Sequence, residues 1–179
     1  GDAIYLMAVL GLRPIELLHL SVKKDKAEGT EFWWCNYQKR SGGGVTNPRR
    51  LYSLPMRTDA DNKAGGRSDS ALLSRWRSGN VLLPSLVSGT SPGDCVATYL
   101  ERRPYWRELK TSQKEKGESL SPYSLRRSYS LRGHCLGIDA GSMAMAMGHT
   151  LECHLREYRW ASSASTAEAF ARATASCHN

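Results

Sequence analysis

Apolar positions near the start of the chain predict two buried helices joined by a tight turn. Residues 3–10 (AIYLMAVL) are nearly all apolar, and Gly11 ends this run. Pro14 opens a second segment, IELLHL, because the fixed φ of proline suits the first turn of a helix. Arg13 therefore lies in the connection between two apolar segments, where an arginine usually has a specific partner.

From about residue 19 to residue 56 the pattern changes to one typical of strands. The segment EFWWCNYQ is rich in aromatic residues, and RRLYSLP alternates between polar and apolar positions. The intervening KRSGGGVTNP predicts a hairpin with a long, glycine-rich tip. Residues 57–68 are polar and contain glycine, which indicates a loop.

The rest of the chain is mainly helical in pattern. Residues 110–121 are charged and are expected to form a loop. An alanine-rich segment, residues 164–175, is expected to form a last helix that packs on this chain or on a neighbour. Further helices are predicted over 69–82, 93–103, 122–133, 139–147 and 151–159.

Length and charge narrow the class of protein. A chain of 179 residues that is 40% hydrophobic predicts one compact domain. Its 25 Lys and Arg against 17 Asp and Glu give a net charge of +8, which favours a polyanionic partner such as nucleic acid. These basic residues are spread along the chain, which predicts a broad contact surface instead of a basic tail.

The pattern indicates neither a metal or disulfide framework nor a membrane span. The five cysteines form an odd set without a C-x-x-C pair, which favours a reducing, cytoplasmic compartment. Three of them adjoin histidines, but neighbours on a helix diverge by about 100° and rarely share a metal. No apolar run approaches the roughly 20 residues that cross a bilayer, so no membrane contact, metal or other cofactor is expected.

Three segments contain residue types that phosphate chemistry uses, and each has an ordinary explanation by itself. In GLRPIELLHL, Arg13 could form a buried ion pair with Glu16. In SPYSLRRSYSLRGH, Arg126 could belong to a solvated helix face. In MGHTLECHLREY, Gly148 could cap a helix and Tyr158 could be a core aromatic residue.

Together, their order and spacing resemble the tyrosine recombinase (phage integrase) family over about residues 3–160. The first segment looks like the family's first arginine box, with Arg13 as the catalytic arginine and Glu16 as the acid that supports it. The second is similar to the H-x-x-R box, with Arg126 as its arginine and Tyr123 in place of the usual histidine.

The third segment resembles the family's Gly-His step followed nine residues later by the nucleophile, here His149 and Tyr158. Such enzymes also carry a catalytic lysine on a hairpin, for which Lys39 is the candidate. Three other lysines near the hairpin remain alternatives to it: Lys23, Lys24 and Lys63.

The resemblance implies a mainly α-helical α+β fold, a helical catalytic domain with a small antiparallel three-stranded sheet on one side. It implies a catalytic domain over 1–160 and a C-terminal tail or helix over 161–179 that is exchanged between subunits. The family's N-terminal DNA-clamping domain is expected to be absent from this chain. The expected partner is double-stranded DNA, bound as a homotetramer by a protein that is monomeric when free, cytoplasmic and associated with the nucleoid.

The implied activity is site-specific DNA recombination or integration through a 3′-phosphotyrosyl intermediate. Two arginines would hold the phosphate oxygens by planar, bidentate hydrogen bonds, and a lysine would protonate the leaving oxygen. Tyr123 can donate a hydrogen bond but is a poor general base near neutral pH. Two alternatives remain open: DNA relaxation like that of a type IB topoisomerase, and a catalytically inactive DNA-binding module derived from a recombinase.

Overall fold

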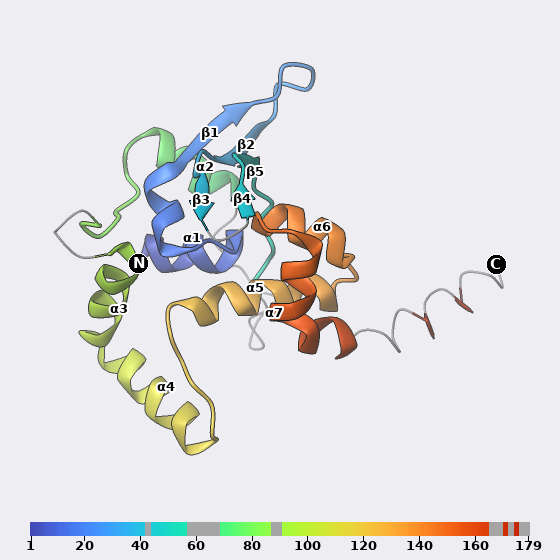
Figure 1. The fold of residues 1–179 in the computed structure, drawn as a ribbon. Helices are drawn as coiled ribbons and strands as arrows, with labels where there is room; N and C mark the ends of the chain where they lie inside the picture. Colours follow the sequence, from blue (N-terminus) through green and yellow to red (C-terminus); the bar gives the residue numbers. More distant parts are fainter. Residues whose placement is uncertain (42–43, 57–68, 87–90, 165–169, 172–173, 176–179) are drawn as a thin grey trace.

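The computed structural model describes residues 1–41, 44–56, 69–86, 91–164, 170–171 and 174–175 (Figure 1). Its first helix, α1 (Asp2–Leu10), is central and largely buried. It ends at Gly11, whose positive φ of 64° lets its N–H bond the carbonyl of Met7. The second apolar segment forms a 3-10 helix, η1 (Pro14–His19), of which only Glu16 and Leu17 are buried.

A three-stranded antiparallel sheet covers one side of the molecule, in the order β1-β2-β5. Its strands are β1 (Leu20–Lys24), β2 (Glu31–Cys35) and β5 (Arg49–Arg50). The predicted hairpin between β2 and β5 forms, with Trp34 opposite Arg50. Its connection contains a second hairpin, β3 (Lys39–Ser41) with β4 (Gly44–Thr46), which the sequence pattern did not predict.

The predicted strand RRLYSLP is wrong beyond its first two residues. After Arg50 the chain leaves the sheet because its apolar side chains pack on the helices. Leu51 joins the main core, and Leu54 packs with Tyr129 and Met143. The backbone N–H of Leu54 donates to the carbonyl of Val9 at 2.9 Å, which ties this segment to α1 instead of to a strand.

Six further helices follow along the described parts of the chain. They are α2 (Asp69–Arg77), α3 (Pro92–Glu101), α4 (Pro104–Glu115), α5 (Tyr123–Cys135), α6 (Ala140–Met147) and α7 (Leu151–Ala164). The loop predicted over 110–121 is wrong for its first half, which belongs to α4. Pro104 occupies the first turn of α4, and Trp106, the buried residue of this helix, anchors an otherwise mainly polar segment.

The fold is α+β and mainly helical, with a small antiparallel three-stranded sheet, as predicted. The predicted loop 57–68 and most of the predicted final helix 164–175 lie outside the described residues. Within the described residues, no helix is both long and apolar enough to cross a membrane.

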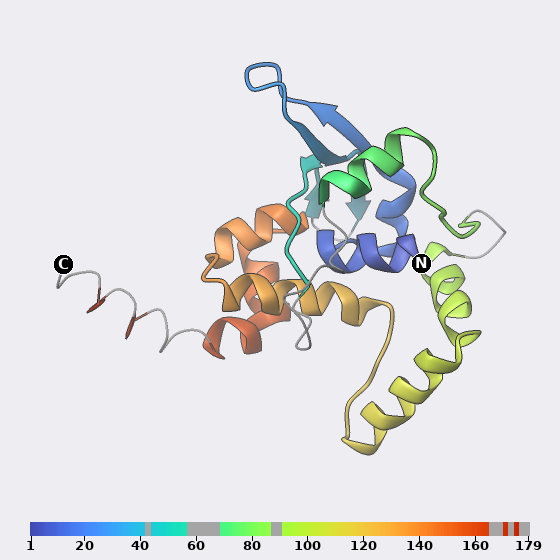
Figure 2. The ribbon, with the colours of Figure 1, turned by 180° about the vertical axis from the view of Figure 1, so that it is seen from behind.

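Helix α5 connects the two halves of the molecule. It packs on α1 and contacts α6 and α7, whereas α3 packs on η1 and on α4 (Figure 2). The approach to α1 is close because a Cβ on Gly11 would lie 2.5 Å from the ring of Tyr129. A Cβ on Gly133 would lie 2.3 Å from the sulfur of Met143 on α6. These two glycines bring the ends of α1, α5 and α6 to one place, where the candidate site lies.

Candidate active site

The carboxylate of Glu16 is the fixed centre of the site. It lies on η1 and is completely buried. One oxygen accepts the backbone N–H of Arg13 at 2.8 Å, and the other accepts the Nη1 of Arg13 at 3.0 Å. The sequence therefore placed the acid correctly beside its arginine, since the turn that opens at Pro14 puts residues three apart on one side.

Two more guanidinium groups approach the same carboxylate. The Nη2 of Arg49 donates to it at 2.9 Å, and the Nη1 of Arg126 lies 3.6 Å from its other oxygen. Burial alone raises the pKa of Glu16, but Arg49, Arg126 and Arg13 together hold that pKa below its ordinary value. Within the described residues, three cations share one carboxylate, so the cluster carries a net charge of +2.

Arg126 is held by the ends of two helices. Its side chain is fully buried and donates to the carbonyls of Gly11, just past α1, and Met147, the last residue of α6. The C-terminal carbonyls of a helix lack partners and carry partial negative charge, so they suit a cation. Arg126 therefore does not belong to a solvated helix face, which was the alternative explanation for it.

The cluster is short of hydrogen-bond acceptors. Two buried donors, Nη1 of Arg49 and Nε of Arg126, have no hydrogen-bond partner among the described residues. Burial and the neighbouring Arg126 charge lower the pKa of Arg13. The cluster has more buried positive charge than negative charge, and it has N–H donors without acceptors. A phosphate-like anion would complement both features.

His149 enters this cluster from the turn after α6. Helix α6 is capped by Gly148, whose φ is 68° and whose Cβ, if present, would lie 2.6 Å from the Arg49 guanidinium. A glycine is therefore required for Arg49 and this turn to meet. Burial and then the charge of Arg126 lower the pKa of His149 to about 3, so its ring is neutral at pH 7.

Tyr158 lies on α7, with its ring beside that of His149. Its side chain is only 1% exposed, and its Oη is 3.3 Å from the Oη of Tyr123. Burial raises the pKa of Tyr158, although Arg126 acts to lower it, so the phenol is protonated at neutral pH. The helical geometry of α7 breaks at this residue, with φ of −123° and ψ of 21°.

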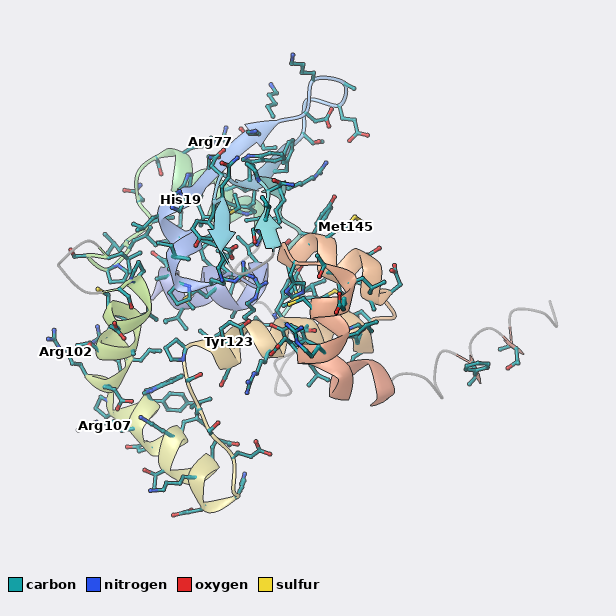
Figure 3. All side chains as sticks on the ribbon, viewed as in Figure 1. His19, Arg77, Arg102, Arg107, Tyr123 and Met145 are labelled. Atoms are coloured by element: carbon teal, nitrogen blue, oxygen red, sulfur yellow. The ribbon has the colours of Figure 1, made fainter. Side chains whose placement is uncertain are left out.

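Tyr123 is the first residue of α5, where Figure 3 labels it, and its side chain is 38% exposed. It stands in the position where the resemblance led us to expect a histidine. In the structure its hydroxyl contacts that of Tyr158, and the guanidinium of Arg127 lies 5.9 Å from its ring. Tyr123 therefore lies between the nucleophile candidate and the surface.

Lys39 is exposed and lies one strand away from the cluster. It pairs with Thr46, whose Oγ1 donates to the carbonyl of Gly148 at 3.1 Å, next to His149. Lys23 and Lys24 instead pair with the far end of β2, opposite the end that meets Arg49. The fourth candidate, Lys63, lies outside the described residues.

Three residues in or next to the site received no role from the sequence: Arg49, His134 and His154. No local signal distinguishes Arg49 from Arg50, because burial depends on the packing of α6 against β5. The spacing of His154 and Tyr158 offered a signal, since residues four apart share one face of a helix. Their rings are stacked at 4.9 Å.

Comparison with known proteins adds nothing to this geometry. No protein-family model matches the chain, and no curated protein or solved structure matches it. In the part of the chain that the structure describes, no group of three or more His, Cys, Asp or Glu side chains could hold a metal ion. The site consists of a buried cluster of three arginines that share one carboxylate, with the buried phenol of Tyr158 close to Arg126.

Proposed function

We propose that this chain breaks and rejoins DNA strands through a tyrosine nucleophile, as a site-specific recombinase or integrase. The observation that carries the proposal is the cluster of Arg13, Arg49 and Arg126, with net charge +2, beside the phenol of Tyr158. A phosphodiester repels nucleophiles because it is negatively charged, and its transfer places more charge on the non-bridging oxygens. A pre-arranged set of guanidinium groups reduces the repulsion and stabilises the added charge on these oxygens.

In this mechanism Arg13 and Arg126 hold the non-bridging oxygens of the phosphate. Arg49 fixes Glu16 and the turn before His149, since it bonds the carboxylate and the carbonyl of Ala146. The Oη of Tyr158 gives its proton to His149 as it attacks phosphorus and forms a 3′-phosphotyrosyl ester, while the 5′-oxygen leaves with a proton from Lys39. A 5′-hydroxyl from a partner strand reverses the step.

Tyr123 takes a positioning role in this scheme. A phenol is a weak base near neutral pH, so it does not replace the proton-transfer capacity of a histidine. Its hydroxyl contacts that of Tyr158 and can donate to a phosphate oxygen once DNA displaces this contact. Because Tyr123 stands where the resemblance implies a histidine, we expect the reaction to be slow but not abolished.

The proposed partner is double-stranded DNA, bound through the dispersed basic residues. We further propose that four copies assemble on DNA and that the segment 161–179 of one copy packs on a neighbour. A pocket of about 430 Å³ supports this arrangement, since it is lined by apolar side chains that include Leu54, Met143 and the exposed Met145. Deleting 161–179 should then leave strand cleavage intact and abolish strand exchange.

The test is a covalent trapping experiment. The chain is incubated with nicked duplexes drawn from the DNA that flanks its gene, and protein–DNA adducts are separated under denaturing conditions. A nick next to the cleaved phosphate releases the short 5′-hydroxyl fragment and so traps the adduct. Tyr158→Phe should abolish the adduct and retain DNA binding, whereas Tyr105→Phe, at a residue that is 75% exposed, should behave like the wild type.

The outcomes separate the competing functions. If an adduct still forms with Tyr158→Phe, the nucleophile is another residue. If the wild type forms no adduct, the chain is a DNA-binding module without this activity. If an adduct forms, joining of strands from two duplexes indicates a recombinase. A change in linking number without joining indicates a topoisomerase.

A further inference from the structure

Three histidines form a continuous hydrogen-bonded row that leads away from the site. The Nε2 of His149 lies 2.9 Å from Nδ1 of His154, and Nε2 of His154 lies 2.9 Å from Nε2 of His134. The side chains of His154 and His134 are almost completely buried. Neither has a part in the reaction described above.

When all three rings are neutral, only one assignment of N–H protons to the ring nitrogens satisfies these hydrogen bonds. His134 also makes a backbone hydrogen bond with Ile138 that raises its pKa, so the histidine donates and the carbonyl accepts. Its Nε2 faces His154, so the donor to Ile138 is Nδ1, and Nε2 of a neutral His134 must accept. His154 therefore donates from Nε2 and accepts at Nδ1.

The same logic extends to the active site. Because Nδ1 of His154 accepts, His149 must donate from Nε2, which leaves Nδ1 of His149 as an unprotonated acceptor. A backbone carbonyl next to His134 thus determines the protonation of a nitrogen two rings away. The ring of His149 lies 5.7 Å from the ring of Tyr158, and the ring of His154 is stacked on that of Tyr158.

The surrounding charges favour movement of a proton along the row, away from the arginines. Burial and then Arg126 lower the pKa of His149, on which Arg13 and Arg49 act in the same direction. Burial, His134 and Arg126 lower the pKa of His154 to about 4. Burial also lowers the pKa of His134, but the negative charge of Asp139 raises it. A positive charge is therefore best tolerated at His134.

We propose that His154 and His134 are positioning residues that form a proton relay, in which His149 accepts the proton released in the active site and His134 holds it. The relay rests on the proposed function for its proton source, the hydroxyl of Tyr158. The assignment of protons to the ring nitrogens is independent of the proposed function.

The step balances as a chain of proton transfers. The Tyr158 proton moves to Nδ1 of His149, the Nε2 proton of His149 moves to Nδ1 of His154, and the Nε2 proton of His154 moves to Nε2 of His134. His134 becomes an imidazolium, while the phenolate oxygen bonds phosphorus. The 5′-oxygen takes its proton from Lys39, which becomes neutral. Rejoining reverses every transfer, so the relay returns to its starting order.

The first experiment uses the wild-type chain without DNA. Long-range proton–nitrogen correlation spectra of the chain labelled with nitrogen-15 in its histidine rings report which ring nitrogens carry protons. At pH 7 we expect protons on Nδ1 of His134 and on Nε2 of both His154 and His149. A proton on Nδ1 of His149 would overturn the proposal. Because no DNA is present, this result is independent of whether the chain cleaves DNA.

The second experiment removes the end of the row. His134→Phe keeps a ring but leaves Nε2 of His154 without an acceptor, so the proton order should reverse and place a proton on Nδ1 of His149. The rate of adduct formation should then fall by about 10²-fold, the lower end of what a general base contributes. An unchanged His149 spectrum, or an unchanged adduct rate, refutes the relay.

The matched control is His19→Phe. His19 lies at the end of η1, packs against Tyr37 at 5.2 Å and has no contact with the row, so its loss should change neither the His149 spectrum nor the rate. If His134→Phe does not fold, the wild-type spectrum alone decides the proton order. If the wild type forms no adduct, the proposed function fails, and the spectrum still shows whether the row is ordered as described.

Discussion

Glu16 offers the sharpest test of the charge balance in the site. Its carboxylate accepts from the backbone and side chain of Arg13, bonds Arg49 and lies near Arg126. Glu16→Gln keeps the size of the side chain and one acceptor oxygen. It removes the negative charge that the three guanidinium groups share and turns an amide N–H₂ toward N–H donors.

The expected loss of stability is large for a substitution without change of volume. Removing one partner of a buried ion pair typically costs about 3–5 kcal/mol because the remaining charge stays buried. The free energy of unfolding of a domain is about 5–15 kcal/mol, so the variant keeps only part of it. With a slope of about 2 kcal/mol per molar urea, the midpoint of unfolding should fall by roughly 2 M.

The assay is urea unfolding in chloride and in sulfate at equal ionic strength. The cluster charge rises from +2 to +3 in the variant, so sulfate should stabilise Glu16→Gln more than the wild type. Glu101→Gln is the control, because its ion pair with Lys110 is exposed and worth at most ~1 kcal/mol. The control also measures the general effect of sulfate. A loss under about 1 kcal/mol, or equal sulfate effects in both variants, refutes the shared-carboxylate interpretation.

Three further outcomes follow from the described contacts. Lys39→Ala should slow adduct formation on a substrate with a 5′-oxygen leaving group and not on one with a 5′-sulfur, because a thiol ionises near pH 8.5 and needs no proton donor; equal slowing on both would point to another role. Gly133→Ala should destabilise the fold by about 1–3 kcal/mol in urea unfolding, because its Cβ would meet the sulfur of Met143 at 2.3 Å; a neutral result would mean that Met143 moves freely. The pKa of His149 falls from 6.5 to about 3 on folding, so the unfolded chain binds the proton more tightly and stability should fall as the pH drops from 6.5 towards 3; His149→Gln should reduce this slope, measured by unfolding midpoints at several pH values.

Local patterns along the chain predict much of the secondary structure. The apolar run before Gly11, the proline at the start of η1 and the glycine after α6 each determine local backbone geometry, so the sequence predicts them well. The prediction failed where tertiary packing overrides local pattern. RRLYSLP alternates like a strand, but burial of Leu51 and Leu54 against the helices ends β5 after Arg50. The charged segment after residue 110 continues α4, which a buried Trp106 anchors.

The features of the site likewise fall into those that depend on local sequence and those that depend on tertiary packing. The sequence by itself determined the pairing of Arg13 with Glu16 and the turn that presents His149, because these depend on neighbours within a few residues. Only the tertiary structure decided that Arg126 and Arg49 share that carboxylate, since this requires α1, α5 and α6 to meet at two glycines. It also decided the row from His149 to His134, because a hydrogen-bonded chain across two helices depends on distances that no spacing in one sequence contains.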